Sequence, residues 1–165
     1  IGWFQGRSEF GPRGLGNRSI LSLATEQKYK DVVNEKVKKR EAWRPFCPTI
    51  IEEKSEEMLV NSIYAPYMIL GFEMKNPELY PAVSHVDQTA RPQLVSKEAN
   101  PRYHKLLTAY NKITGLPLFI NTSFNVHEEP IVCKPEEGLK SLQKGVIDYF
   151  VCGNYIIQKK KNHHK

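Results

Sequence analysis

The sequence predicts a single α/β domain built on an open, twisted, mixed sheet with flanking helices. Short runs rich in β-branched and aromatic residues recur along the chain, and segments with helical spacing of apolar residues separate them. A length of 165 residues with 40% hydrophobic content is enough for one buried core. We therefore expect one domain over residues 1–158 and a basic, disordered tail over residues 159–165.

The expected strands are bounded by glycine, proline and small polar residues, which favour turns. Eleven prolines support many fixed turns between short elements. The segments with strand-like composition are residues 2–5, 19–24, 47–51, 67–72, 82–86, 93–95, 117–121, 148–151 and 154–158.

Residues 25–38 form the first expected helix. Thr25 is in position to cap it, and the apolar residues that follow at helical spacing are Tyr29, Val32, Val33 and Val37. We expect the last turn of this helix to deliver lysines to a surface.

Two further helices have clearer boundaries. In the first, Asn100 caps, Pro101 occupies the first position and Gly115 ends the helix. Its expected buried stripe consists of Tyr103, Leu106, Leu107, Tyr110 and Ile113. The second begins at Pro135, where Glu136 and Glu137 interact favourably with the helix dipole.

The composition limits the classes of function. A formal charge of +6 fits either a nucleic-acid surface or a pocket for a small polyanion. The cations lie among glycine turns and strand ends rather than in a stripe, which favours the pocket. No apolar run is long enough to cross a membrane, so we expect a soluble, cytoplasmic protein without a membrane partner. The three cysteines lack CxxC spacing and are expected to be buried, reduced thiols.

The glycine-rich segment at residues 6–19 is the first with chemistry. It combines four glycines with Arg7, Arg13 and Arg18. Glycines let backbone N–H groups approach a phosphate, and guanidinium groups bind phosphate in pairs of hydrogen bonds. Gly11 and Gly16 have the spacing of a Walker A loop, but the lysine of that motif is missing. The alternative is a tight hairpin with solvent-facing arginines.

A second basic segment, residues 37–48, lies between the first helix and a buried strand. Here Lys38, Arg40 and Arg44, with the aromatic Trp43, are expected to frame a charged pocket. The alternative is that these cations only stabilise a helix C-terminus, and we prefer that interpretation for Lys36 and Lys39.

Polar residues at strand ends complete the expected pocket. Asn121, Ser123 and Asn125 follow an apolar strand, and ligands of open α/β sheets bind outside strand carboxyl ends. An Asx or Ser turn is the alternative. Arg91 is expected to clamp phosphate, whereas His85 is expected to be structural. The histidines lack metal-ligand spacing, so no metal ligand is assigned.

Four segments together resemble a known family. GRSEFGPRGLGNRSIL, VNEKVKKREAWRPFCPTI, PAVSHVDQTARPQ and TGLPLFINTSFNVHEEPIVCKPEEGL look like successive motifs of the C-terminal domain of nodulation-type and antibiotic-type O-carbamoyltransferases. The resemblance implies a YrdC-like (Sua5-like) fold with a basic cleft. It also implies that carbamoyl phosphate and ATP, accompanied by Mg²⁺, are converted to carbamoyl-adenylate, pyrophosphate and phosphate. A separate N-terminal Kae1-like domain would then transfer the carbamoyl group to an acceptor hydroxyl.

The resemblance also assigns residues. By motif, the ligand contacts of the family fall on Arg13, Lys38, Arg44, Arg91, Asn121 and Ser123. We expect Lys38, Arg44 and Ser123 to be catalytic, with Lys38, Arg44 and Arg13 on carbamoyl phosphate, Arg91 on the nucleotide phosphates, and Asn121 with Ser123 orienting the reacting groups. The expected binding residues are Arg13, Arg91, Asn121, Gly11, Gly16, Arg18 and Asn125.

The chain departs from the family pattern at three positions. Gly14 stands where alanine is usual, Glu129 where glycine is usual and Lys134 where threonine is usual. Glu129 could repel part of an anion site. Two other functions stay open: an RNA-binding YrdC-like module, which the net positive charge also fits, and a degenerate regulatory nucleotide-binding domain, which the departure at Glu129 suggests.

Overall fold

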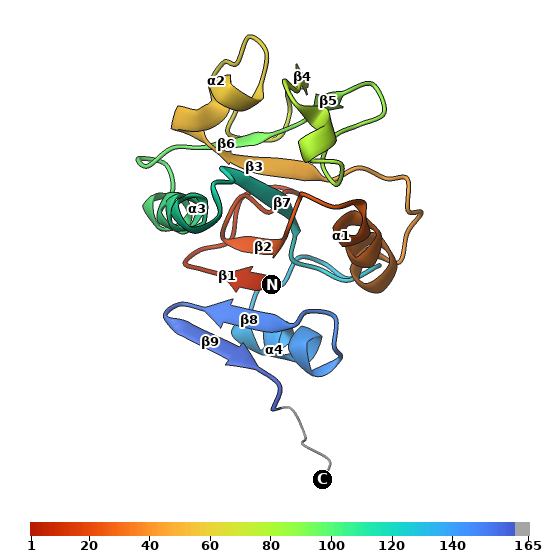
Figure 1. Ribbon diagram of the computed structural model, residues 1–165. Helices are drawn as coiled ribbons and strands as arrows, with labels where there is room; N and C mark the ends of the chain where they lie inside the picture. Colours follow the sequence, from red (N-terminus) through yellow and green to blue (C-terminus); the bar gives the residue numbers. More distant parts are fainter. Residues whose placement is uncertain (161–165) are drawn as a thin grey trace.

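A computed structural model describes residues 1–160 and contains an open, seven-stranded mixed sheet (Figure 1). The strand order is β6-β3-β7-β2-β1-β8-β9. The expected α/β class is confirmed, whereas residues 161–165 of the expected tail lie outside the described residues. The strands of the sheet are β1 (Gly2–Phe4), β2 (Arg18–Ser22), β3 (Cys47–Ile51), β6 (Gln93–Val95), β7 (Leu118–Ser123), β8 (Tyr149–Cys152) and β9 (Tyr155–Gln158).

The central strand β7 runs antiparallel to both of its neighbours, β2 and β3. Asn121 pairs with Leu21 on one side and with Cys47 on the other, and Ser123 pairs with Ser19. The carboxyl end of β7 therefore lies beside the beginnings of β2 and β3. The loops that lead into these strands reach the same end of the sheet, which positions the candidate site.

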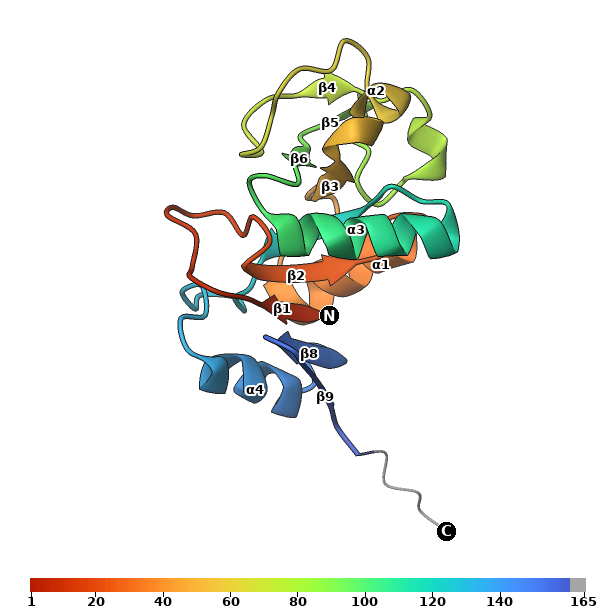
Figure 2. The same ribbon diagram turned by 90° about the vertical axis from the view of Figure 1, so that its left-hand side faces the viewer.

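The helices cover both faces of the sheet, with α3 (Pro101–Thr114) on the opposite side from α1 (Gln27–Val32), as Figures 1 and 2 show. Tyr103 and Leu107 of α3 are fully buried in one apolar cluster against Trp3 and Phe119. The other face carries the larger cluster, which includes Leu142 of α4 (Pro135–Gln143). Apolar side chains thus fill both layers.

The predicted caps of α3 and the predicted start of α4 are confirmed. The side chain of Asn100 accepts a hydrogen bond from the backbone N–H of Tyr103, and Gly115 adopts the left-handed conformation with φ 76°. Pro135 begins α4 as expected. The buried stripe of α3 is shorter than predicted, because Ile113 in the last turn is 84% exposed.

The first helix differs from its prediction. The cap position belongs to Glu26 rather than Thr25, and its side chain makes no capping hydrogen bond. The α-helix ends at Val32 and continues as a π-helix, η1 (Val33–Lys38). The wider π turn carries an extra residue, and such turns are frequent at functional sites.

Two predicted strands are wrong, and both lie near β4 (Phe72–Glu73) and β5 (Thr89–Ala90), which form a separate ribbon. Residues 67–71 form turns and loop rather than strand. Residues 82–86 also form turns and loop rather than strand. Ala82 and Val83 pack into the larger apolar cluster without pairing to another strand. This region also contains three short helices: η2 (Glu52–Lys54), α2 (Ser55–Met58) and η3 (Pro77–Leu79).

Two smaller expectations can also be compared with the structure. Within residues 1–160, no helix is both long and apolar enough to cross a membrane. Cys47 is buried as expected, but Cys133 is exposed and Cys152 is partly exposed.

Candidate functional site

Two adjoining hollows lie where β7 ends and where β2 and β3 begin. They have volumes of about 80 and 390 Å³. Both are lined by Arg13, Arg40, Thr122 and Ser123, so they form one continuous lining. The smaller hollow also takes in Arg91, Cys47 and Asn121, and the larger one Lys38, Arg44 and Asn125.

Most of the predicted site residues therefore meet, although they are far apart in sequence. Those that line the hollows are Arg13, Lys38, Arg44, Arg91, Asn121, Ser123 and Asn125. Gly11, Gly16 and Arg18 do not line either hollow. Arg18 is buried, donates to the backbone oxygens of Gln5 and Gly6, and stacks 3.5 Å from the ring centroid of Phe4. Its contacts are those of a structural residue.

The glycine loop between β1 and β2 uses its own amides internally, which differs from the expected phosphate cradle. Glu9 Oε1 accepts the backbone N–H groups of Leu15, Asn17 and Arg18, and Ser19 accepts that of Gly16. The left-handed φ of 105° at Gly16 and its contact with the Tyr103 ring require glycine there. What the loop offers to the hollows is therefore the side chain of Arg13. Within the described residues, Arg13 has no hydrogen-bond or ion-pair partner.

A turn after η1 carries Arg40 and Arg44, and the buried side chain of Asn34 organises it. Asn34 Nδ2 donates to the backbone oxygens of Ala42 (3.2 Å) and Arg44 (2.9 Å), and its Oδ1 accepts from Arg40 Nε at 2.7 Å. Lys39 completes the turn with φ 44°. Burial and the neighbouring Arg44 lower the pKa of Arg40, which is still a permanent cation at neutral pH.

Two residues of this turn are more exposed than expected. Arg44 lines the larger hollow and also forms an ion pair with Glu41 at 2.9 Å. Trp43 is 72% exposed and lies 5.8 Å from the Arg44 guanidinium. Trp43 does not line either hollow, so the expected aromatic frame is not formed by this residue.

Lys38, the last residue of η1, is buried against the end of β7. Its Nζ donates to Ser123 O (2.7 Å), Asn125 Oδ1 (2.7 Å), Asn125 O (3.1 Å) and Ser123 Oγ (3.3 Å). An ammonium group has three protons, so these four oxygens occupy all of its donors. Burial, with a smaller contribution from Arg40, lowers the pKa of Lys38 to about 7. This lysine therefore fixes the end of β7.

The orientation of Asn121 follows from a buried network. Gln93 Nε2 donates to the carbonyl of Leu15 at 2.7 Å, so Gln93 Oε1 faces Thr49 and Asn121. Asn121 must present its Nδ2 group to that oxygen, at 2.8 Å. Its Oδ1 is left buried and, within the described residues, without a donor. A buried acceptor in this state can receive an N–H or O–H group from a ligand or water.

Arg91 extends from β5 toward the beginning of β3. One of its terminal nitrogens lies 3.4 Å from Cys47 Sγ, and the other donors have no partner within residues 1–160. His85 lies outside the hollows, and its Nδ1 contacts Thr89 Oγ1 at 3.4 Å. Burial lowers the pKa of His85, in keeping with the structural role expected for it.

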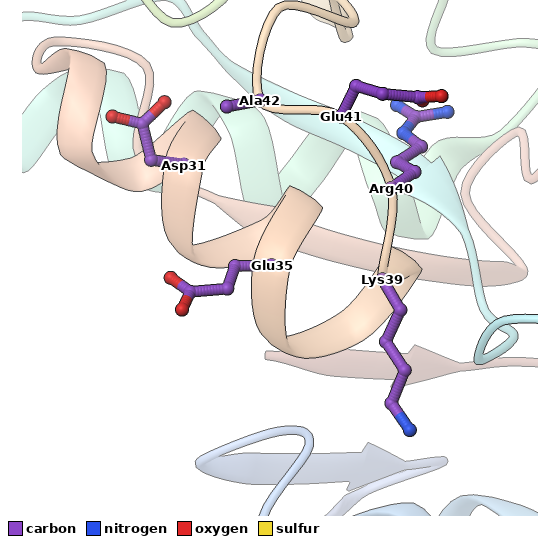
Figure 3. Close-up of a pocket in the computed structure, with 6 residues that line it drawn as sticks. All are labelled: Asp31, Glu35, Lys39, Arg40, Glu41 and Ala42. Atoms are coloured by element: carbon purple, nitrogen blue, oxygen red, sulfur yellow. The ribbon is translucent and has the colours of Figure 1, made fainter.

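A third hollow, of about 450 Å³, adjoins the larger one and shares Lys39, Arg40 and Glu41 with it (Figure 3). Asp31 and Glu35 lie on the helical segment that forms one wall of this hollow, and their carboxylates point away from Lys39. These negative charges disfavour a polyanion in this third hollow. The predominantly cationic part of the lining therefore ends near Arg40.

The departure at Glu129 lies outside this lining. Glu129 lines a different hollow, and its carboxylate lies 3.4 Å from Lys144. Its backbone oxygen accepts Asn125 Nδ2, which helps to orient the Asn125 side chain toward Lys38. No group of three or more histidine, cysteine or acidic side chains suited to a metal ion occurs within residues 1–160.

Sequence reasoning missed two contributors. Arg40 was expected in the charged pocket without a ligand role of its own, and it lines both hollows. Asn34 and Glu9 organise the two loops from positions that no spacing rule singles out. A buried asparagine beside a π-helix and an acid within a basic loop were the available signals.

Comparisons with known proteins give a consistent result. The family described as Carbamoyltransferase C-terminus matches residues 1–159. The chain is similar to nodulation protein NolNO of Sinorhizobium fredii, with 44% identity over 97% of this chain and 24% of that protein. It is also similar to nodulation protein NolO of Bradyrhizobium diazoefficiens, with 41% identity over 97% of this chain and 30% of that protein.

A third relative, an uncharacterized protein of Methanocaldococcus jannaschii, is 40% identical over 97% of this chain and 27% of its own length. The chain therefore spans about a quarter to a third of the length of these curated relatives.

Proposed function

The chain belongs to the family described as Carbamoyltransferase C-terminus, and from that premise we propose that its two adjoining hollows bind carbamoyl phosphate and the phosphates of ATP. The full activity would be O-carbamoyl transfer, with the remaining steps carried out by an N-terminal Kae1-like domain of a longer protein on an acceptor hydroxyl.

The observation that carries the proposal is the convergence of four arginines from three distant segments. Arg13 comes from the glycine loop, Arg40 and Arg44 from the turn after η1, and Arg91 from β5, and all line the two hollows. Guanidinium groups bind phosphate oxygens through parallel hydrogen bonds. Fixed cations also stabilise the charge that develops when phosphate and pyrophosphate leave, without a protein nucleophile.

The sizes of the hollows favour a different division of the two ligands from the one expected from the sequence. A hollow of about 80 Å³ cannot take a nucleotide, whereas about 390 Å³ is within the range of ligand sites. We therefore assign carbamoyl phosphate to the smaller hollow with Arg13 and Arg91. The ATP phosphates go to the larger one with Arg40 and Arg44. Lys38, bonded to Ser123 and Asn125, fixes the end of β7 where the two hollows meet.

Asn121 provides a means of recognising the carbamoyl group. Phosphate oxygens are acceptors, so they cannot satisfy the buried Oδ1 of Asn121. The amino group of carbamoyl phosphate has two N–H donors and can. A ligand with a methyl group in that place would not form this hydrogen bond and would lose the roughly 1 kcal/mol that it contributes.

The reaction requires positioning more than acid–base chemistry. Water releases phosphate from carbamoyl phosphate, the carbamate oxygen attacks the α-phosphorus of ATP, and pyrophosphate leaves to give carbamoyl-adenylate. Arg91 and Arg13 would hold the first phosphate, Arg40 and Arg44 the pyrophosphate, and Ser123 would hydrogen-bond the reacting groups. Mg²⁺ would enter with ATP and neutralise part of its charge.

The test is pyrophosphate release from ATP by the full-length protein, with and without carbamoyl phosphate. We expect release to require carbamoyl phosphate, and we expect Arg44→Ala to lower it by a factor of about 100. Acetyl phosphate, which has a methyl in place of the amino group, should not replace carbamoyl phosphate.

Lys112→Ala on the exposed end of α3 is the control and should leave release unchanged. Release that does not depend on carbamoyl phosphate, or an Arg44→Ala protein with normal release, would contradict the proposal.

A further inference from the structure

We infer that Glu9 is a positioning residue: it occupies an anion-binding nest of backbone amides within the glycine loop and so holds Arg13 at the hollows. The inference rests on the proposed function for the ligand of Arg13, but not for the state of the loop itself. Neither the motifs nor the family comparison assigns this role to Glu9.

The geometry of the nest is defined by three short contacts. The single oxygen Oε1 of Glu9 accepts the backbone N–H groups of Leu15 (2.6 Å), Asn17 (2.7 Å) and Arg18 (3.2 Å). Successive amides that point at one oxygen form the kind of concavity that binds phosphate in other glycine loops. In this chain a carboxylate from the same loop fills that place. An incoming phosphate therefore meets the side chain of Arg13 instead of the amides.

The nest closes the loop around Arg13. The carboxylate joins position 9 to positions 15–18, so the segment that carries Arg13 is tied at both ends. Two further bonds anchor the far side of the loop: Gln93 Nε2 donates to Leu15 O at 2.7 Å, and Asn100 Nδ2 donates to Asn17 Oδ1 at 3.2 Å. Arg13 itself has no partner among the described residues, so the loop backbone, rather than a side-chain contact, sets the region that its guanidinium can reach.

The loss of this carboxylate would have two effects. Three amides would lose their acceptor, and an unsatisfied buried N–H group is costly enough to change the loop conformation. Arg13 would then sample positions away from the hollows. The chemical requirement is an acceptor of the right shape, so an amide side chain at position 9 should largely serve, because its Oε1 can accept the same three bonds.

The experiment compares Glu9→Ala and Glu9→Gln in the full-length protein. Hydrogen–deuterium exchange reports on residues 11–18, and carbamoyl phosphate affinity is measured separately. In Glu9→Ala we expect faster exchange of this segment and about tenfold weaker binding, as for the loss of one charge-assisted contact. In Glu9→Gln both should stay close to wild type. Glu98→Ala, on the exposed turn before α3, is the matched control.

A rescue experiment with formate is a more specific test, because this small carboxylate can accept hydrogen bonds from the amides that Glu9→Ala leaves without an acceptor. Added formate should slow the exchange of the Glu9→Ala loop and restore part of its affinity, with no effect on wild type. Unchanged exchange in Glu9→Ala, or Glu9→Gln behaving like Glu9→Ala, overturns the inference. If wild type does not bind carbamoyl phosphate, the proposed function fails, while the exchange arm still decides the role of Glu9.

Discussion

Lys38 and Arg13 line the same hollow, but the protein holds these two cations in different ways. Lys38 is buried, and four oxygens of Ser123 and Asn125 surround its Nζ. Arg13 is exposed on a loop whose amides are satisfied by Glu9, and it has no partner within residues 1–160. A basic group whose donors are all occupied holds neighbouring segments together, whereas a cation with open donors is available to a ligand. Charge alone therefore does not identify a ligand-binding residue.

The largest expected effect tests this contrast directly. Lys38→Met leaves Asn125 O without a donor and removes one of the donors of Ser123 O and Asn125 Oδ1, so we expect it to lower the free energy of unfolding by about 2 kcal/mol. Arg13→Met removes no internal bond and should change it by less than about 0.5 kcal/mol. Urea denaturation followed by circular dichroism measures both. Equal losses would remove the distinction between the two cations.

The pH dependence of stability sharpens the contrast. The pKa of Lys38 is lowered from 10.5 to about 7 in the folded protein. Below pH 7 both states are protonated and folding carries the full cost of burying the charge. As pH rises from 7 to 10.5 the folded state releases its proton first, so stability rises relative to Lys38→Met, by at most about 1.4 kcal/mol per pH unit. If the free energies of unfolding of the two proteins change in parallel between pH 7 and 10.5, the pKa of Lys38 is not lowered by folding.

The smallest effect concerns the departure from the family pattern. Glu129 is paired with Lys144 and lies outside both hollows. Solvent and the paired Lys144 screen the exposed Glu129 carboxylate from a ligand in the hollows. Glu129→Gly should therefore change carbamoyl phosphate affinity by no more than roughly twofold. Arg91→Met in the smaller hollow provides the comparison and should weaken binding about tenfold. A large gain in affinity with Glu129→Gly would mean that the acid does repel the ligand.

Much of the fold could be predicted because its signals are local. The cap at Asn100, the terminating Gly115 and the first proline of α4 each act within a few residues, and all are confirmed. The predicted strands at residues 67–72 and 82–86 failed because their apolar residues do not pair in a sheet: Tyr67, Ile69 and Val86 are exposed, whereas Ala82 and Val83 pack into the core from a turn. The π-helix is not visible in the spacing, since Val33 and Val37 also fit an α-helix.

The sequence predicted which residues gather at the site, but not which of them bind a ligand and which hold the fold. Motifs brought Arg13, Lys38 and Asn121 into one group, and the structure places all three at the hollows. That Lys38 is internally bonded, that Arg18 is buried, and that Glu9 fills the amides of the loop depend on distances between segments. Such distances have no counterpart in sequence spacing.

The register of β7 has a consequence for the whole chain. A ligand in the two hollows would touch segments near residues 13, 44, 91 and 121, and so would tie together parts of the polypeptide that are separated by dozens of residues. Such a ligand binds only when all these segments are folded together, so its binding stabilises the folded state relative to the unfolded state. Resistance to proteolysis and to heat should accordingly increase with ligand concentration.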